Sequence, residues 1–377
     1  MLPASEPKGM GANGCGGESA WLLEAKLKLL LAGDYDYPFY EPACAKALES
    51  LGVRVERFAW GRWFRNGSPG RLQAKYMVGP AVWHINRCLE RMALQTRPDV
   101  VLVWRGNPVW PRTLDSIKRQ TGALLISHHN DDPLEQGRRY YWRHLLRAMP
   151  SYDMHLAYRH RSLREFVALG AREVHLMRSY YVPDLHHPST LLHEDHALYG
   201  AQAVFVGHYE PDGRWQHLRA LLGAGVDLHV FGGNWPSPHA LPELVRLPRH
   251  CVPIRPVVGE EYLKALCGAQ LALNFLSRRN RDTYTRRCFE ITACGRLLLS
   301  ERTEDLLTLF REDVEAVYFS SPEELVTKAR HLLAHPRHVA SIASAGMRRC
   351  VAEGHDVQSR MAELVTLIRT TLQSKRV

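Results

Sequence analysis

The chain opens with a short apolar run followed by a helical pattern. Residues 26–33 read KLKLLLAG, and apolar residues then recur at helical spacing over residues 43–51. Gly52 follows where a left-handed residue commonly ends a helix, and residues 53–58 alternate between apolar and polar side chains. The pattern predicts a strand, a helix and a second strand.

The same alternation continues through the first half of the chain. Apolar runs recur at residues 99–104, 123–127 and 154–157, and a polar or helical stretch follows each of them. Strands that are apolar throughout and alternate with helices are typical of parallel sheets buried on both faces. The first half is therefore predicted to form one parallel α/β domain.

A second series begins beyond residues 183–196, a stretch with prolines and several histidines that we interpret as a linker. The predicted strands are residues 202–207, 227–232, 271–275 and 296–300, and the predicted helices cover residues 215–222, 263–267, 288–294, 322–333 and 357–372.

We predict an α/β protein of two Rossmann-like, doubly wound domains that face each other across a cleft. A length of 377 residues fits two domains of about 150 to 200 residues each. The expected parts are a flexible leader (1–24), an N-terminal domain (25–190), a C-terminal domain (200–350) and a last helix (351–377) that packs back on the N-terminal domain. Ligands of such folds bind at the carboxyl ends of the strands.

The charge balance favours an anionic partner. The chain has 49 Lys and Arg against 39 Asp and Glu, a formal charge of +10, and 45% hydrophobic residues, which excludes a disordered chain. The charge alone does not distinguish nucleic acid, an anionic surface and a phosphorylated small molecule, because all three are attracted by the same field.

Cysteines and the N-terminal residues indicate a cytoplasmic protein. None of the eight cysteines forms a C-x-x-C pair, which disfavours a zinc site, and scattered single thiols are typical of a reducing compartment. The first twenty residues lack the apolar region of a signal peptide, and no apolar run is long enough to span a membrane. The glycine-rich residues 9–17 follow no strand, so we interpret them as leader.

A basic loop follows the predicted strand 271–275. Residues 277–290 read SRRNRDTYTRRCFE and contain five arginines. At a strand end and a helix start, guanidinium groups and free backbone N–H groups favour a diphosphate. The alternative is a solvated basic loop without a ligand, since runs of like charge usually face solvent.

A set of ordered motifs carries a resemblance to a known family. In chain order they are VFVGHYEPDGRW (204–215), DLHVFGGNW (227–235), EEYLKALCGAQLALNF (260–275), RRCFEITACGRLLLSERTEDLLTLF (286–310), SSPEELVTKARHLLAHP (320–336) and HDVQSR (355–360). This stretch resembles the C-terminal domain of GT-B glycosyltransferases, most closely their CgeB-like, spore-maturation group. The N-terminal half is similar only in its Rossmann-like pattern and in HHNDDP (128–133).

The resemblance implies roles for three residues. Glu290 stands where such enzymes have a carboxylate before A-x-G, here completed by Gly295, and would accept hydrogen bonds from the ribose of a nucleotide sugar. Asp282 stands eight positions earlier, where many retaining relatives have a glutamate that contacts the donor sugar. The Asp is shorter, and the usual Gly-Phe-Gly beside it is missing. Without a ligand, Glu290 would simply suit the positive end of a helix.

Four further residues are expected to bind the donor diphosphate or approach it. Gly207 ends the first strand of the second domain and would permit close approach of a phosphate, although a turn glycine is an equal alternative. Arg214, Arg286 and Arg287 would neutralise the diphosphate as it leaves. Fixed positive charge stabilises that transition state, so no metal is required.

The HHNDDP segment supplies the acid/base candidates, which are His128, His129, Asp131 and Asp132. If the enzyme inverts, one of them takes the proton of the acceptor hydroxyl; if it retains, no dedicated base is needed. The alternative is a turn before Pro133 whose carboxylates cap the next helix. One Asp pair beside histidines is weak support for a divalent ion.

The main hypothesis is a glycosyltransferase that moves a sugar from a nucleotide-diphosphate donor to a glycan, protein or small-molecule acceptor, with no cofactor besides that co-substrate. The alternative is a non-catalytic module of the same fold that holds an anionic polymer or nucleic acid. The arginines are confined to one strand-end loop, which disfavours this alternative. A nucleotide-sugar epimerase is a third hypothesis.

Overall fold

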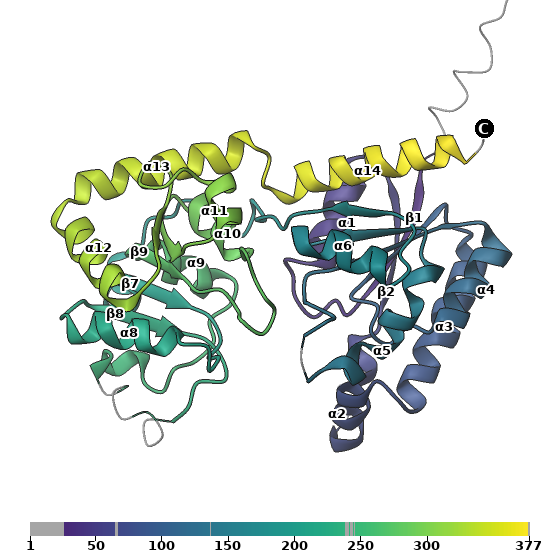
Figure 1. The fold of residues 1–377 in the computed structure, drawn as a ribbon, viewed down its shortest axis with the longest axis horizontal. Helices are drawn as coiled ribbons and strands as arrows, with labels where there is room; N and C mark the ends of the chain where they lie inside the picture. The colour runs from purple at the N-terminus through teal and green to yellow at the C-terminus, as the bar shows by residue number, and fades with distance from the viewer. Residues whose placement is uncertain are drawn as a thin grey trace, which may run out of the picture.

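The computed structural model describes residues 26–64, 67–135, 137–237, 241, 244 and 246–375. These residues form two α/β domains that lie next to each other along the longest axis of the molecule (Figure 1). The expected leader over residues 1–24, with its glycine-rich part, lies outside the described residues. Within the described part of the chain, no helix is both long and apolar enough to cross a membrane.

Six parallel strands form the sheet of the N-terminal domain, in the order β2-β1-β3-β4-β5-β6. Their bounds are β1 Lys28–Gly33, β2 Arg54–Ala59, β3 Val100–Trp104, β4 Leu124–His129, β5 Met154–Ala157 and β6 Val174–Leu176. Every residue of β3 and β4 is buried, because helices cover both faces of the sheet.

The helices of this domain are α1 Glu41–Ser50, α2 Gly67–Tyr76, α3 Pro80–Thr96, α4 Pro111–Thr121, α5 Arg139–Ala148 and α6 His160–Ala168, with short 3₁₀ turns η2 Gly61–Phe64 and η3 Met149–Ser151. One core cluster packs α1 and the last helix of the chain against one face of the sheet, and a second packs α3, α4 and α5 against the other.

Five parallel strands form the second sheet, in the order β11-β10-β9-β7-β8. The strands are β7 Ala201–Val206, β8 Leu228–Phe231, β9 Ala269–Asn274, β10 Leu297–Glu301 and β11 Val317–Phe319. The helices are α7 His193–Tyr199, α8 Arg214–Gly223, α9 Glu260–Cys267, α10 Arg287–Ala293, α11 Glu304–Leu309, α12 Pro322–Ala334 and α13 Pro336–Ala352, with a 3₁₀ turn η5 Arg249–Cys251. Two parallel α/β domains confirm the predicted fold class.

The last helix, α14 (Val357–Ser374), leaves the C-terminal domain and lies along the N-terminal domain (Figure 1). Its apolar side, including Leu364 and Ile368, is buried in the same core as α1. Where the chain enters α14, it pairs with the segment between β6 and α7, because Tyr181 N donates to His355 O at 2.9 Å and Val357 N donates to Tyr181 O at 3.0 Å. The chain therefore crosses between the domains twice, at one place.

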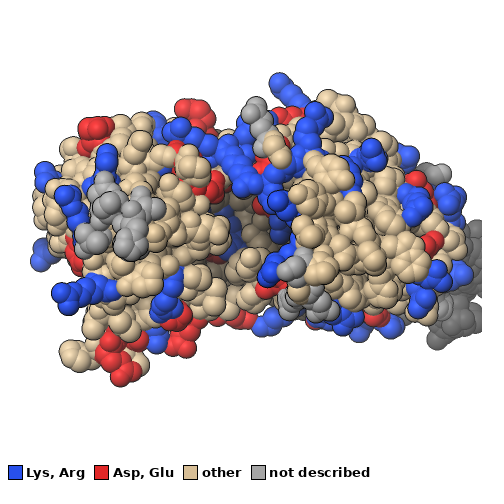
Figure 2. Space-filling model, turned by 90° about the horizontal axis from the view of Figure 1, so that it is seen from below, with Lys and Arg blue, Asp and Glu red and all other residues tan. Residues whose placement is uncertain are grey.

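The carboxyl ends of the two sheets meet where the domains meet. Residues that directly follow β4 and β5 contact the loop that follows β9, as described below. Seen from below, the surface is hollowed between the two domains, and Lys and Arg side chains gather along the rims of this hollow (Figure 2). This is the place at which the fold predicts a ligand.

Candidate functional site

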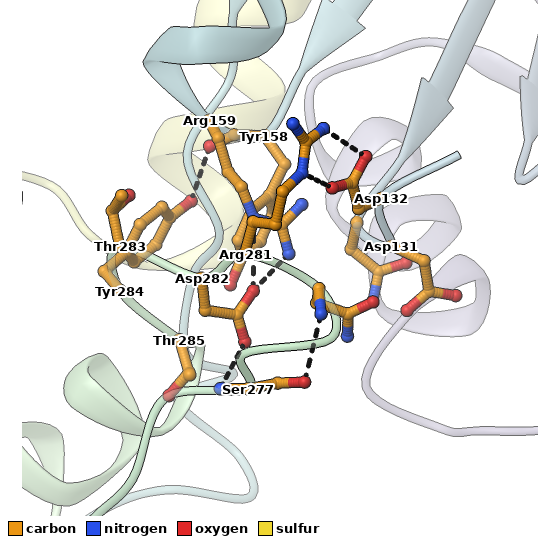
Figure 3. A network of polar contacts seen from close by, with 12 residues as sticks. Asp131, Asp132, Tyr158, Arg159, Ser277, Arg281, Asp282, Thr283, Tyr284 and Thr285 are labelled. Carbon is orange, nitrogen blue, oxygen red and sulfur yellow. Dashed lines mark hydrogen bonds and ion pairs between the residues drawn. The ribbon is translucent and has the colours of Figure 1, made fainter. Parts of the chain in front are cut away.

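The basic loop after β9 reaches across to the N-terminal domain (Figure 3). Arg281 donates through Nε and Nη2 to the carboxylate of Asp132, the latter at 2.9 Å. The same guanidinium donates to Glu165 of α6 at 2.8 and 3.0 Å. The Asp132 side chain is only 3% exposed, so one arginine of the C-terminal domain neutralises a buried carboxylate of the other domain.

A second ion pair across the domains lies beside the first. Arg159, just after β5, donates through Nε to Asp282 Oδ1 at 3.1 Å and also through Nη2 (Figure 3). The Ser277 N–H donates to the other oxygen of Asp282 at 3.3 Å. Burial raises the pKa of Asp282, and the Arg159 charge opposes that rise. Asp282, expected to contact a donor sugar, is held by a residue of the other domain.

Arg279 forms a third such contact. Its Nε donates to Glu135 Oε2 at 2.6 Å, and the Glu135 side chain is 3% exposed. The expected alternatives for this loop were a phosphate site and a solvated basic face. The structure shows that Arg279 and Arg281 are instead ion-paired to carboxylates of the N-terminal domain, so they add less free positive charge to the cleft than the sequence suggests.

Glu290 lies at the start of α10 and is completely buried. Tyr262 donates to Glu290 Oε2 at 2.6 Å, and the other carboxylate oxygen lies 2.7 Å from Arg286 Nε and 3.3 Å from His186 Nε2. Burial alone would raise the pKa of this carboxyl. The charge of Arg286 and the hydrogen bond from the Tyr262 hydroxyl outweigh burial and lower the pKa, so Glu290 is an anion.

Two arginines beside Glu290 have buried N–H groups without hydrogen-bond partners. The guanidinium carbon of Arg286 lies over the Phe39 ring, 3.5 Å from its centroid, and 4.9 Å from the centroid of Tyr40. Among the described residues, Arg286 Nη1 and Arg287 Nε have no hydrogen-bond partner, whereas Arg286 Nε and Glu290 Oε1 form the 2.7 Å ion pair with each other. Buried polar atoms without partners are costly, and a cluster of them indicates a place where a ligand supplies the missing groups.

The loop after β7 is held together by Arg214. This side chain is buried, and its guanidinium donates to Asp212 Oδ1 at 2.8 Å and to the His208 carbonyl at 2.6 Å. A further bond from Nη2 also reaches Asp212. All three guanidinium nitrogens therefore have partners within the loop, and a role for Arg214 toward a diphosphate stays a prediction.

Two of the predicted glycines have clear conformational reasons. A Cβ on Gly207 would lie 2.6 Å from the ring of Phe205, and a Cβ on Gly232 would lie 1.8 Å from the Gly207 carbonyl oxygen. The backbones at the ends of β7 and β8 can therefore approach each other this closely only with glycine at both positions. Gly295 has φ 65° directly after α10, a left-handed conformation that favours glycine. Both serve the fold; binding of phosphate by Gly207 is untested.

Arg278 is the exposed arginine of the loop for which no partner is found among the described residues. Its Nη2 lies 3.7 Å from where a Cβ would stand on Gly213, the residue just before α8. Beside it opens a cavity of about 470 Å³, whose lining includes Arg161, Arg302 and Ser320. Arg278 therefore adds an available cation to the cleft, between the loops that follow β7 and β9.

The two histidines of HHNDDP are buried and neutral. The His128 ring donates through Nδ1 to Leu156 O at 3.2 Å and packs edge-on against Trp104. His129 Nδ1 lies 3.0 Å from the Asp131 carbonyl oxygen, which leaves Nε2 without a partner among the described residues. Burial lowers the pKa of His128 to about 3 and that of His129 to about 4.

The two aspartates of HHNDDP are both ion-paired. Asp131 accepts from Arg105 Nη2 at 2.5 Å, and its side chain is 27% exposed. Asp132 is paired to Arg281, and its Oδ1 also accepts from the Leu134 N–H at 3.0 Å. The turn expected as part of the alternative for this segment is therefore present at Asp132, but among the described residues no side chain caps α5, the helix that follows. Asp131 is the more accessible of the two carboxylates.

Sequence reasoning missed several residues of the site. Arg159 directly follows the predicted strand 154–157, so the strand-end rule applied to that strand would have found it. Glu135, Tyr40, Tyr262 and His186 stand in loops or helices, and their sequence neighbours give no sign of their partners.

The fold is that of a known class of structures. Two parallel α/β domains with their strand ends at a shared cleft make up the GT-B fold, which solved glycosyltransferase structures share. Residues 214–366 match a family model described as glycosyl transferase-like. No curated protein matches the sequence.

Solved structures show the same fold over nearly the whole chain. Sucrose-phosphate synthase from Thermosynechococcus elongatus has a TM-score of 0.67 at 12% identity and covers 93% of this chain and 100% of that chain. HepE from Anabaena, in complex with UDP and glucose, has a TM-score of 0.61 at 13% identity and covers 91% and 100%. A putative UDP-N-acetylglucosamine 2-epimerase from Listeria monocytogenes has a TM-score of 0.59 at 12% identity and covers 93% and 98%.

Proposed function

We propose that the protein is a glycosyltransferase of the CgeB-like group, which moves a sugar from a nucleotide-diphosphate donor to an acceptor without a metal ion or another cofactor. The observation that carries this proposal is the cluster of unpartnered buried N–H groups of Arg286 and Arg287 beside the Glu290 anion. Guanidinium N–H groups fit a diphosphate, and a carboxylate can accept a hydrogen bond from a sugar hydroxyl. The HepE complex with UDP and glucose supports a donor of this kind.

The chemistry follows from where charge develops. When the glycosyl bond breaks, negative charge grows on the diphosphate, and fixed guanidinium groups stabilise that state more than the ground state. We assign this role to Arg286 and Arg287, with Arg278 as the exposed cation nearby. Glu290 would accept hydrogen bonds from the ribose and so fix the position of the nucleotide.

Among the acid/base candidates, we propose Asp131 as the first to test. It is the more accessible carboxylate of the pair, whereas His128 and His129 are buried and have strongly lowered pKa values, which makes them weak bases. Asp131 would take the proton of an acceptor hydroxyl after exchanging its bond to Arg105. The expected cytoplasmic location belongs to the same proposal.

The test uses a pair of matched variants. Arg286–Glu290 and Arg311–Glu315 are both ion pairs between residues four positions apart with a buried glutamate, but only the first lies at the cleft. We expect UDP, GDP or TDP to bind the natural protein in titration calorimetry. Glu290→Gln, which keeps the shape of the side chain, should weaken that binding more than about tenfold, because it removes a charge that orients Arg286.

Glu315→Gln should leave nucleotide binding unchanged, and circular dichroism would show that both variants are folded. Indifference of the natural protein to every nucleotide and nucleotide sugar would refute the proposed function. Equal binding by Glu290→Gln would refute the role of Glu290. Analysis of the products formed from a bound nucleotide sugar distinguishes a transferase from an epimerase. An epimerised sugar without transfer or donor cleavage would support an epimerase instead.

A further inference from the structure

A cluster of metal-ligating side chains lies outside the cleft, at the outer edge of the second sheet. His229 stands on β8, the edge strand, and His250 and Cys251 stand in η5. One ligand atom from each of the three residues lies within 4.8 Å of the others. None of the contacts described for Glu290, Arg286 or Arg287 involves these residues.

The local fold explains why the three residues meet. Because β8 is an edge strand, its outer N–H groups need partners from elsewhere. The segment after η5 runs along this edge, where Gly232 N donates to Arg255 O at 2.9 Å, and the backbone of Val230 hydrogen-bonds the Cys251 thiol. The thiol is thereby held beside the ring of His229, which also contacts the His250 ring at 4.7 Å between centroids.

The surroundings of His229 resemble those of a metal ligand. Its ring is 3% exposed, and Nδ1 has no hydrogen-bond partner among the described residues. Nε2 lies 3.8 Å from Asp227 Oδ1, and the Leu198 backbone also hydrogen-bonds the ring. Metal-binding histidines commonly use one nitrogen for the metal and give the other N–H to a carboxylate or carbonyl, which fixes the ring.

We propose that His229, His250 and Cys251 bind one zinc ion, which fastens η5 to the edge of the second sheet. Two imidazoles and one thiolate are a ligand set suited to Zn²⁺, and water would complete the tetrahedron. In a tetrahedral zinc site the ligand atoms lie about 3.4 Å apart, so small side-chain rotations would bring these three into place. The sequence gives no sign of this site, because His229 is far along the chain from the other two ligands and no C-x-x-C pair is present.

The experiment is cobalt and zinc titration of the full chain, freed of its purification tag and of metal. Cobalt(II) bound by a thiolate absorbs in the near ultraviolet. We expect this band to appear and to saturate at one equivalent, and zinc(II) should abolish it by displacing the cobalt. Cys251→Ser should lose the band.

The matched control is Cys88→Ser, because Cys88 Sγ lies 3.4 Å from His84 Nε2 in the other domain and forms the comparable Cys–His contact. This control should keep the band. His250 is exposed, so His250→Ala should leave the protein folded, and it should weaken zinc binding more than about tenfold.

The proposal is overturned if the natural protein shows no thiolate band, if Cys251→Ser keeps it, or if the band depends on Cys88. If Cys251→Ser does not fold, the zinc affinity of the folded His250→Ala variant is compared with that of the natural protein. An unchanged affinity would refute the proposed zinc site. Nucleotide binding is a separate measurement, so failure here leaves the proposed transferase untouched.

Discussion

Removing Arg281 tests whether the basic loop holds the domains together. Arg281→Met keeps much of the side-chain length but removes the charge that pairs with Asp132 and Glu165. Asp132 is 3% exposed and Glu165 is 24% exposed, so the first carboxylate would be left buried and unpaired, whereas the second would be hydrated. The loss of stability should therefore come chiefly from Asp132.

The magnitude lies between two limits. Breaking a fully buried pair costs about 3–5 kcal/mol, and an exposed pair contributes about 0–1 kcal/mol. Arg281 itself is 29% exposed, which screens part of the interaction. We therefore expect the free energy of unfolding to fall by about 2–3 kcal/mol. Part of this loss should disappear when the natural protein and the variant are compared in high salt, because salt screens the partly exposed pair.

Urea unfolding followed by circular dichroism and by tryptophan fluorescence measures this difference, and small-angle X-ray scattering measures whether the domains separate. Arg255→Met is the control, because Arg255 forms a bidentate pair with Glu261 inside the C-terminal domain and at the surface. Arg255→Met should lower the free energy of unfolding by less than about 1 kcal/mol. The structural role would be refuted if both variants lost the same small amount of stability and only Arg281→Met abolished nucleotide binding. That result would make Arg281 a ligand-binding group.

Three further predictions concern chemistry, pH and packing. Asp131→Asn should lower the turnover of sugar transfer by about 10²-fold or more while nucleotide affinity stays within about twofold; unchanged turnover would remove Asp131 as the base. The pKa of His129 is lowered to about 4 in the folded protein, against about 6.5 in the unfolded chain, so its contribution to stability is complete above pH 6.5 and is lost as the pH falls toward 4, by up to about 1.4 kcal/mol per pH unit. The free energy of unfolding, measured by urea titration at several pH values, should fall less steeply with pH in His129→Gln than in the natural protein, and parallel curves would contradict this prediction. Gly232→Ala should destabilise the fold by more than about 3 kcal/mol, because the added Cβ would collide with the Gly207 carbonyl. The control Gly225→Ala, at positive φ but in open space, should destabilise it by about 1 kcal/mol. Similar thermal unfolding of the two variants would show that the backbone at Gly232 can shift to make room.

The buried strands were predictable because their signal is local. The run VVLVW at 100–104 is apolar throughout, as a strand covered on both faces must be, and it forms β3 with every residue buried. Helix α13 was not predicted, because its residues 340–346 are Ala, Ser and Gly apart from Ile342, which leaves few large apolar side chains to mark a face. Helices α2 and α3 were missed as well.

The candidate site was predictable only in part, because partners across the cleft leave no local pattern. The arginine-rich loop and Glu290 could be found from their place after a strand and from the ordered motifs. The sequence could not show that Glu135 and Asp132 neutralise Arg279 and Arg281, since each pair joins residues from different domains. Charge counted along the chain therefore overstated the positive charge available to a ligand.

The double crossing between the domains restricts how they move. Tyr181, after β6, and His355, at the entry to α14, are hydrogen-bonded to each other, so the two segments that cross between the domains are joined at one place. A displacement that separates these two segments would break their hydrogen bonds. A rotation of one domain about them would keep the bonds but would separate the arginine–carboxylate pairs of the cleft.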